Sequence, residues 1–167
     1  MRKGKAVRTS ASLDVYAMSN PALCSVILWS FASGYPAEAG PALPLTFAVL
    51  PIVMSKRSVG TFDGTNVNTG LLGWISRHPE LRVGLPERME KAADLTRDAL
   101  LFGLTNQILQ IDSLGQVCAT RKGLRRSPPY PAADDRGRML NAAKRLGQWM
   151  SASPDTETIF YALGVGL

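Results

Sequence analysis

The chain has 167 residues, of which 19 are lysine or arginine and 13 are aspartate or glutamate, and its net charge is +6. This length suffices for a self-contained core, and a hydrophobic fraction of 46% is ordinary for a globular protein. The longest apolar runs fall short of the roughly 20 residues that span a bilayer, and no apolar segment follows the basic start as in a signal peptide. We therefore expect a globular, cytoplasmic protein without a membrane partner.

The positive charge is concentrated in two segments. The first ten residues contain four basic residues and no acid, at Arg2, Lys3, Lys5 and Arg8. We predict a flexible basic tail over residues 1–18, and beyond it 15 basic groups nearly balance 13 acidic groups. The second cluster consists of Arg121, Lys122, Arg125 and Arg126. These four are candidate nucleic-acid contacts, because clustered cations attract phosphates without reading sequence.

Residues 19–167 are expected to form a single helical domain. Asn20 as N-cap, Pro21 at the first helical position and Gly34 beyond the end predict a first helix over 21–31. Its residues are apolar nearly all round, which indicates burial by the rest of the fold or by a partner. The next run, 43–54, predicts a short buried helix that bends or ends near Leu50, because Pro51 lacks a backbone donor. A pair of buried strands is the alternative.

The middle of the chain predicts a loop and then a compact module. Residues 56–68 are polar and rich in Gly, Thr and Asn, as in a mobile loop. Three short helices are expected next. The first covers residues 69–78 and the second begins at Pro86. The third is capped by Thr96, or by Asp94 just before it, and runs to about residue 106. Two apolar runs on either side of Gly115 predict a β-hairpin. Helices followed by a hairpin are typical of a winged helix-turn-helix, which we predict over about 69–122.

The C-terminal part predicts a linker and two helices. The proline-rich stretch 127–131 cannot be regular structure and is expected to be a surface loop. An amphipathic helix over about 135–150 and a short helix over 156–163 follow, giving C-terminal helices over about 135–165. The predicted fold class is mainly α with a small β-hairpin: a helical bundle containing a winged-helix-like module.

Few side chains in the chain are suited to catalysis. His78 is the one histidine and directly precedes Pro79, so it is expected at a helix end or on the surface. Cys24 and Cys118 lie in apolar runs, which favours buried thiols over a disulfide. No metal-ligand spacing and no phosphate-binding glycine loop is present in the sequence. We expect no catalytic residue, metal, cofactor or small-molecule substrate, and interpret the chain as a binding protein rather than an enzyme.

Several segments resemble the middle-component proteins of bacterial three-component ABC-ATPase systems, specifically the type-three middle-component family. The resemblance covers nearly the whole chain, with the segments in one order. The segments are Asn20-Pro21-Ala22-Leu23-Cys24 through Gly34-Tyr35, Leu43-Pro44-Leu45 with Val49-Leu50-Pro51, Thr96-Arg97-Asp98-Ala99-Leu100, Leu146-Gly147-Gln148-Trp149, and Thr158-Ile159-Phe160-Tyr161-Ala162-Leu163-Gly164-Val165. All of them are packing motifs and none is a catalytic signature.

The resemblance implies a non-catalytic adaptor in a biological-conflict, antiphage system. It would couple an ABC- or SMC-type ATPase subunit to an effector subunit, often a nuclease. The apolar segments would pack into the assembly, and the hairpin region would contact the ATPase or DNA. The candidate interface residues are Leu23, Ile27, Trp29, Phe31, Phe47 and Trp149.

A winged-helix DNA-binding regulator is the alternative function. In such a protein the third helix enters the major groove. The helix expected over 96–106 offers only Arg97 as a charged base reader and also carries Asp98. This composition favours protein partners, with at most a supporting contact to DNA.

Overall fold

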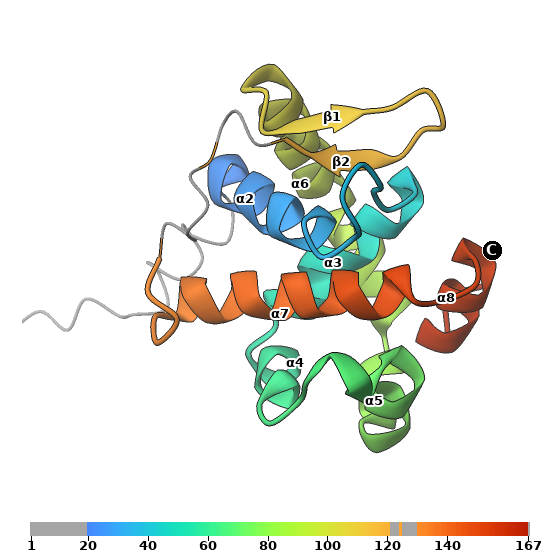
Figure 1. Cartoon of the computed structure of the whole chain (residues 1–167). Coiled ribbons are helices and arrows are strands. Elements are labelled where there is room, and N and C mark those ends of the chain that lie inside the picture. Colours follow the sequence, from blue (N-terminus) through green and yellow to red (C-terminus); the bar gives the residue numbers. More distant parts are fainter. Residues whose placement is uncertain (1–19, 121–123, 125–129, 167) are drawn as a thin grey trace, which may run out of the picture.

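The computed structural model describes residues 20–120, 124 and 130–166 (Figure 1). Its described part is mainly helical with one small antiparallel sheet, which confirms the predicted fold class. The α-helices are α2 (Pro21–Ala32), α3 (Thr46–Val53), α4 (Lys56–Val59), α5 (Leu71–Arg77), α6 (Leu85–Thr105), α7 (Asp135–Ser151) and α8 (Thr156–Leu163). The 3-10 turns are η1 (Leu43–Leu45), η2 (Gly60–Phe62), η3 (Val67–Thr69) and η4 (Pro79–Arg82). The strands are β1 (Leu109–Ile111) and β2 (Val117–Ala119).

Helix α2 lies at the centre of the fold. It packs against α6 and α7, while α3 packs on α6 (Figure 1). In Figure 1 the hairpin lies above α2, α7 crosses below it, and α4 and α5 lie beneath α7. One hydrophobic core joins residues from α2 to α8. The apolar character of α2 on nearly every side therefore follows from its position between other helices of the same chain.

The ends of α2 follow the local rules that its sequence predicts. The Asn20 side chain accepts a hydrogen bond from the Ala22 amide at 2.9 Å, and Pro21 occupies the first helical position. An N-cap side chain satisfies an amide that has no partner inside the helix, which contributes roughly 1 kcal/mol. The predicted helix is confirmed with its expected start, and it ends one residue later than expected.

The segment 43–54 is helical, and the strand alternative is wrong. Pro51 lies inside α3, which continues to Val53, so the helix does not end near Leu50. Pro51 is buried, as are most α3 residues, so tertiary packing offsets the single backbone hydrogen bond that proline removes. The Pro51 carbonyl accepts a hydrogen bond from Arg88 Nη1 at 3.0 Å. The other terminal nitrogen of Arg88 donates to the Leu81 carbonyl at 2.9 Å.

The expected loop over 56–68 contains α4, η2 and η3 instead, so this prediction is wrong. Its hydroxyl side chains organise it locally: Thr61 donates to the Ser58 carbonyl at 2.6 Å and Thr65 to the Phe62 carbonyl at 2.7 Å. Such side-chain to backbone bonds compete with longer regular structure and favour short turns. The indole of Trp149 then donates to the Asn66 carbonyl at 3.0 Å and ties the segment to α7.

Helix α6 replaces two of the three helices expected before the hairpin. It runs without a break through Thr96, which is buried and donates its hydroxyl hydrogen to the Ala92 carbonyl at 2.9 Å. A residue bonded in this way is a helix-interior residue, so the predicted cap at Thr96 or Asp94 is wrong. The order of elements that suggested a winged helix is thus not present in the described residues.

The predicted hairpin and the C-terminal helices are confirmed. Leu109 pairs with Ala119 and Ile111 with Val117, and Gly115 adopts a φ of 74° in the turn. Asp134 caps α7, and α8 ends at Gly164, whose φ of 74° suits glycine. Of the proline-rich stretch 127–131, residues 127–129 lie outside the described residues.

Candidate functional site

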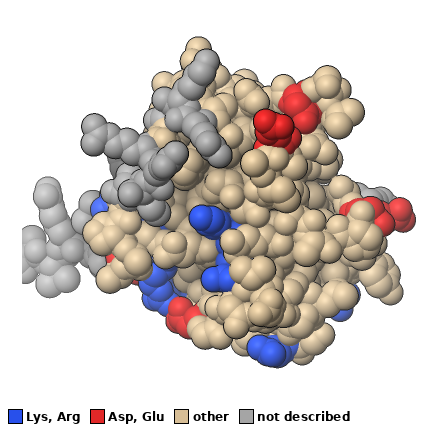
Figure 2. Space-filling view, viewed as in Figure 1, with Lys and Arg blue, Asp and Glu red and all other residues tan. Residues whose placement is uncertain are grey.

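The candidate phosphate contacts Arg121, Lys122, Arg125 and Arg126 lie outside the described residues, as does the basic tail. Eight of the 19 lysines and arginines fall in these undescribed segments, but only one acidic residue, Asp14, does. The described part therefore carries 11 basic and 12 acidic residues and is nearly neutral. On the face shown in Figure 2, its lysines and arginines lie mainly over the middle and lower parts. The positive excess of the chain belongs to the undescribed segments.

The structure divides the six candidate interface residues into two groups. Four lie in the core of the chain itself and are at most 7% exposed: Leu23, Ile27, Phe31 and Trp149. Buried side chains offer little area to a partner, so their apolar character reflects internal packing. Trp29 and Phe47 remain partly exposed against that core. Of the six candidate interface residues, Trp29 and Phe47 are therefore the two that a partner could reach on the folded chain.

Trp29 and Phe47 each contact another element of the fold. The indole nitrogen of Trp29 donates to the Thr120 carbonyl at 3.0 Å, which joins α2 to the residue after β2. The guanidinium carbon of Arg97 lies 5.9 Å from the centre of the Phe47 ring, which joins α3 to α6. Leu101 is one helical turn beyond Arg97 and is 62% exposed.

Further exposed apolar side chains occur on α6 and the hairpin. The Leu43 amide donates to the Gly115 carbonyl at 3.3 Å, so the start of the η1–α3 segment lies beside the hairpin turn. Strand β1 packs on α6. We use the name α6–hairpin surface for five apolar residues on these adjoining elements: Phe47, Leu101, Phe102, Ile111 and Leu114.

Sequence reasoning identified only Phe47 of the α6–hairpin surface. Leu101 follows the buried Leu100 directly, and the pattern of apolar residues does not say which of the two faces water. Leu114 in the hairpin turn is 80% exposed. A large apolar residue in a turn was the one available signal, because turns lie on the surface and rarely need such a side chain.

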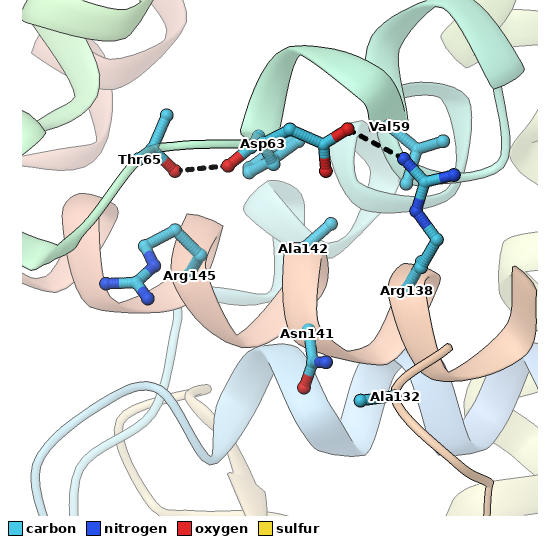
Figure 3. Close-up of a pocket in the computed structure, with 9 residues that line it drawn as sticks. Val59, Asp63, Thr65, Ala132, Arg138, Asn141, Ala142 and Arg145 are labelled. Carbon is cyan, nitrogen blue, oxygen red and sulfur yellow. Dashed lines mark hydrogen bonds and ion pairs between the residues drawn. The ribbon is translucent and has the colours of Figure 1, made fainter. Parts of the chain in front are cut away.

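A pocket of about 280 Å³ lies between the turn after η2 and helix α7 (Figure 3). Its walls include Phe62, Asp63, Arg138, Asn141 and Arg145. Arg138 donates to the Asp63 carboxylate at 2.9 Å, and this ion pair bridges two segments that are distant in sequence. Sequence analysis missed this site, because no local motif indicates that these two segments meet.

The thiols and the histidine are not arranged for nucleophilic catalysis. Cys24 and Cys118 are buried thiols that form no disulfide, as predicted. Burial raises the pKa of Cys24 to about 12, and burial together with the nearby Asp112 charge raises the pKa of Cys118. Thiols with raised pKa values are poor nucleophiles near neutral pH. The partly exposed His78 faces the Glu80 carboxylate, with 3.4 Å between Nδ1 and Oε1.

Two negative findings apply to the described part of the chain. No group of three or more His, Cys, Asp or Glu residues there is arranged to hold a metal ion. None of its helices combines the length and the apolar character needed to cross a membrane.

The described part is a small, mainly helical body with exposed apolar side chains on α6 and the hairpin. Residues 10–167 match the family described as ABC-three component (ABC-3C) system Middle Component 3. This match extends over nearly the whole chain, so the chain belongs to that family. No curated protein and no solved structure matches it.

Proposed function

We propose that this chain is a non-catalytic adaptor that couples an ABC- or SMC-type ATPase to an effector, such as a nuclease, in a bacterial antiphage system. Membership in a family of middle components is the observation that carries the proposal. A component of a multi-subunit system needs a surface for each partner. The adaptor would act in the cytoplasm, where invading nucleic acid is met.

The α6–hairpin surface is our candidate contact for the ATPase. Four of its five side chains are exposed and Phe47 is partly exposed. Exposed apolar groups on adjoining elements are typical of protein interfaces. The surface also comes from elements held in place by the core, since α6 packs on α2 and α3. Such a preformed surface loses little conformational entropy when a partner binds.

The basic segments would assist this role without defining it. We propose that residues 19–167 act as one binding domain, with the 1–18 tail and Arg121, Lys122, Arg125 and Arg126 adding salt-sensitive contacts to nucleic acid. The regulator alternative is not favoured, because α6 is one continuous helix and the three short helices of a winged helix are not found in the described residues.

Co-purification from the native gene neighbourhood tests the proposal. The tagged chain is expressed with the products of the adjacent genes, and we expect an ABC-type ATPase and an effector to co-purify with it. The double variant Leu101→Ser, Leu114→Ser should reduce recovery of the ATPase, because both side chains are more than half exposed.

Leu72→Ser with Val83→Ser is the matched control. These residues are 63% and 77% exposed and lie on α5 and directly after η4, outside the α6–hairpin surface. Recovery of the ATPase with this control should equal the wild type. A monomeric chain that recovers no neighbouring product would refute the adaptor role, whereas equal recovery with both double variants would refute only the chosen surface.

A further inference from the structure

The pocket between the η2 turn and α7 has the character of an anion site. Arg138, Asn141 and Arg145 follow one another at steps of three and four residues, so α7 presents them on one side. Figure 3 shows Arg138 reaching from α7 to Asp63 and Arg145 projecting from the same helix below Thr65. The pocket is open to solvent on one side, and its volume of about 280 Å³ exceeds that of several water molecules at about 30 Å³ each, which is enough for a phosphate group.

The two arginines that line the pocket differ in their ion pairs. Arg138 is paired with Asp63, but none of the ion pairs among the described residues includes Arg145. Arg145 is only partly exposed as a residue, because it lies along the wall of the pocket. Two arginines and one aspartate leave the pocket with a net positive charge. Two uncharged polar residues, Thr65 and Asn141, also line the pocket. The Thr65 hydroxyl already donates to the Phe62 carbonyl, whereas Asn141 can supply an amide donor.

Arg136, in the first turn of α7, already interacts with two side chains. Its guanidinium carbon lies 4.7 Å from the centre of the Tyr130 ring, and its Nε lies 3.4 Å from the Asp134 carboxylate. The contrast makes Arg145 the cation in this region that is best placed to receive a new anion. A guanidinium binds tetrahedral oxyanions well, because its planar array of donors matches two oxygens at once.

We propose that this pocket binds a phosphate group, with Arg145 as the primary contact, Asn141 as a neutral donor and Arg138 as a second cation shared with Asp63. Asp63 competes with the ligand, since its carboxylate already accepts a hydrogen bond from Arg138 at 2.9 Å. A bound phosphate therefore takes over part of the Arg138 interaction, and Asp63 lowers the affinity of the site. The phosphate belongs either to a small compound or to a nucleic-acid backbone.

The test uses the full chain and two probes, inorganic pyrophosphate and a short single-stranded oligonucleotide, in calorimetric titrations at low salt. Arg145→Gln should weaken pyrophosphate binding by about tenfold, the loss expected for one charge-assisted contact. Asp63→Asn should strengthen it by about threefold, because the competing carboxylate is removed. Phe62 lines the pocket and stacks on Trp149 with 5.5 Å between ring centres, so tryptophan fluorescence gives a second readout.

Arg97→Gln and Asp94→Asn are the matched controls. These residues form an exposed ion pair on α6, with 2.6 Å between Nη1 and Oδ1, and they make the same charge changes outside the pocket. Both controls should bind pyrophosphate like the wild type. Thermal melting of every variant verifies that the fold is intact, and Asp63→Asn keeps the test informative if Arg145→Gln is unstable.

The two probes identify the source of the phosphate. If both bind and both depend on Arg145, the site takes a nucleic-acid backbone. If only pyrophosphate binds in that way, it takes a small phosphate compound; either result supports the proposal. If neither probe binds, or if Arg145→Gln and Arg97→Gln weaken binding equally, the proposal is overturned, because the attraction then comes from overall charge. The co-purification experiment changes no residue of this pocket, so it tests the adaptor role independently of the phosphate site.

Discussion

Substitution of Gly147 by alanine should strongly destabilise the fold, because α2 and α7 meet at this residue with no space for a side chain. An added Cβ would lie 2.1 Å from the Phe31 carbonyl oxygen and 3.1 Å from its carbon. Gly34 faces the same crossing from the other side, where a Cβ would lie 2.4 Å from the Lys144 carbonyl oxygen. The two glycines therefore permit the backbones to touch.

The magnitude follows from the displacement that alanine requires. A Cβ atom rarely approaches another atom to less than 3.0 Å, so the two helices must separate by about 1 Å at the contact. Overpacking of this kind costs about 1–3 kcal/mol, and here it disturbs the packing of α7 on the central helix α2. The better helix propensity of alanine offsets up to about 1 kcal/mol. We expect a net loss of about 2 kcal/mol in the free energy of unfolding.

Equilibrium denaturation in urea, with thermal melting alongside, measures the effect. A loss of about 2 kcal/mol should lower the melting temperature by roughly 4–8 °C in a chain of this size. Gly73→Ala in α5 is the control: an added Cβ there meets nothing within 4 Å, so helix propensity alone should stabilise the protein by about 0.5–1 kcal/mol. A Gly147→Ala variant as stable as the wild type would refute the close-contact reasoning.

Three further predictions concern other parts of the fold. Arg88→Gln removes hydrogen bonds to the Pro51 and Leu81 carbonyls and should lower the free energy of unfolding in urea by about 2–3 kcal/mol. Arg97→Gln at an exposed ion pair should lower it by less than about 1 kcal/mol, and equal losses would show that the two Arg88 hydrogen bonds add no special stability. Because burial raises the pKa of Cys24 to about 12, a thiol reagent at mildly alkaline pH should label Cys24 only after denaturation, and mass spectrometry that finds it labelled in the native protein would exclude this explanation. The Thr158 amide lowers the pKa of the Asp155 carboxyl, so the capping stabilisation is present at neutral pH and is lost as the pH falls through the folded-state pKa. Asp155→Ala should accordingly lower the melting temperature at pH 7 but not in acid, where a persisting difference would show that the charge is not responsible.

The sequence predicted those elements whose signals are local. Asn20 with Pro21 marked the start of α2, and Gly115 marked the hairpin turn. Each of these signals acts within a few residues, because a cap or a turn is satisfied by its own neighbours. The scarcity of catalytic groups was likewise readable from residue types alone. The packing motifs between Asn20 and Val165, found in one order along the chain, were sufficient to suggest the family.

Where a local signal competes with packing, the sequence misled. Threonine is a common N-cap residue, yet Thr96 lies inside α6 and is buried. Burial against neighbouring helices stabilises the continuous helix. Proline commonly marks the end of a helix, yet Pro51 lies inside α3. In both cases the stabilisation by tertiary contacts exceeds a local preference of the order of a few kcal/mol.

The candidate sites depend on tertiary structure even more strongly. Composition identified Trp149 and Trp29 equally as apolar residues, but only the packing decides that the first is buried and the second is partly exposed. Asp63 and Arg138 are 75 positions apart and meet only because α7 crosses the η2 turn. By itself the sequence determined the helical class, the capped ends and the family. Tertiary packing decided which apolar groups face water and which distant charges share a pocket, since burial depends on contacts that no local pattern encodes.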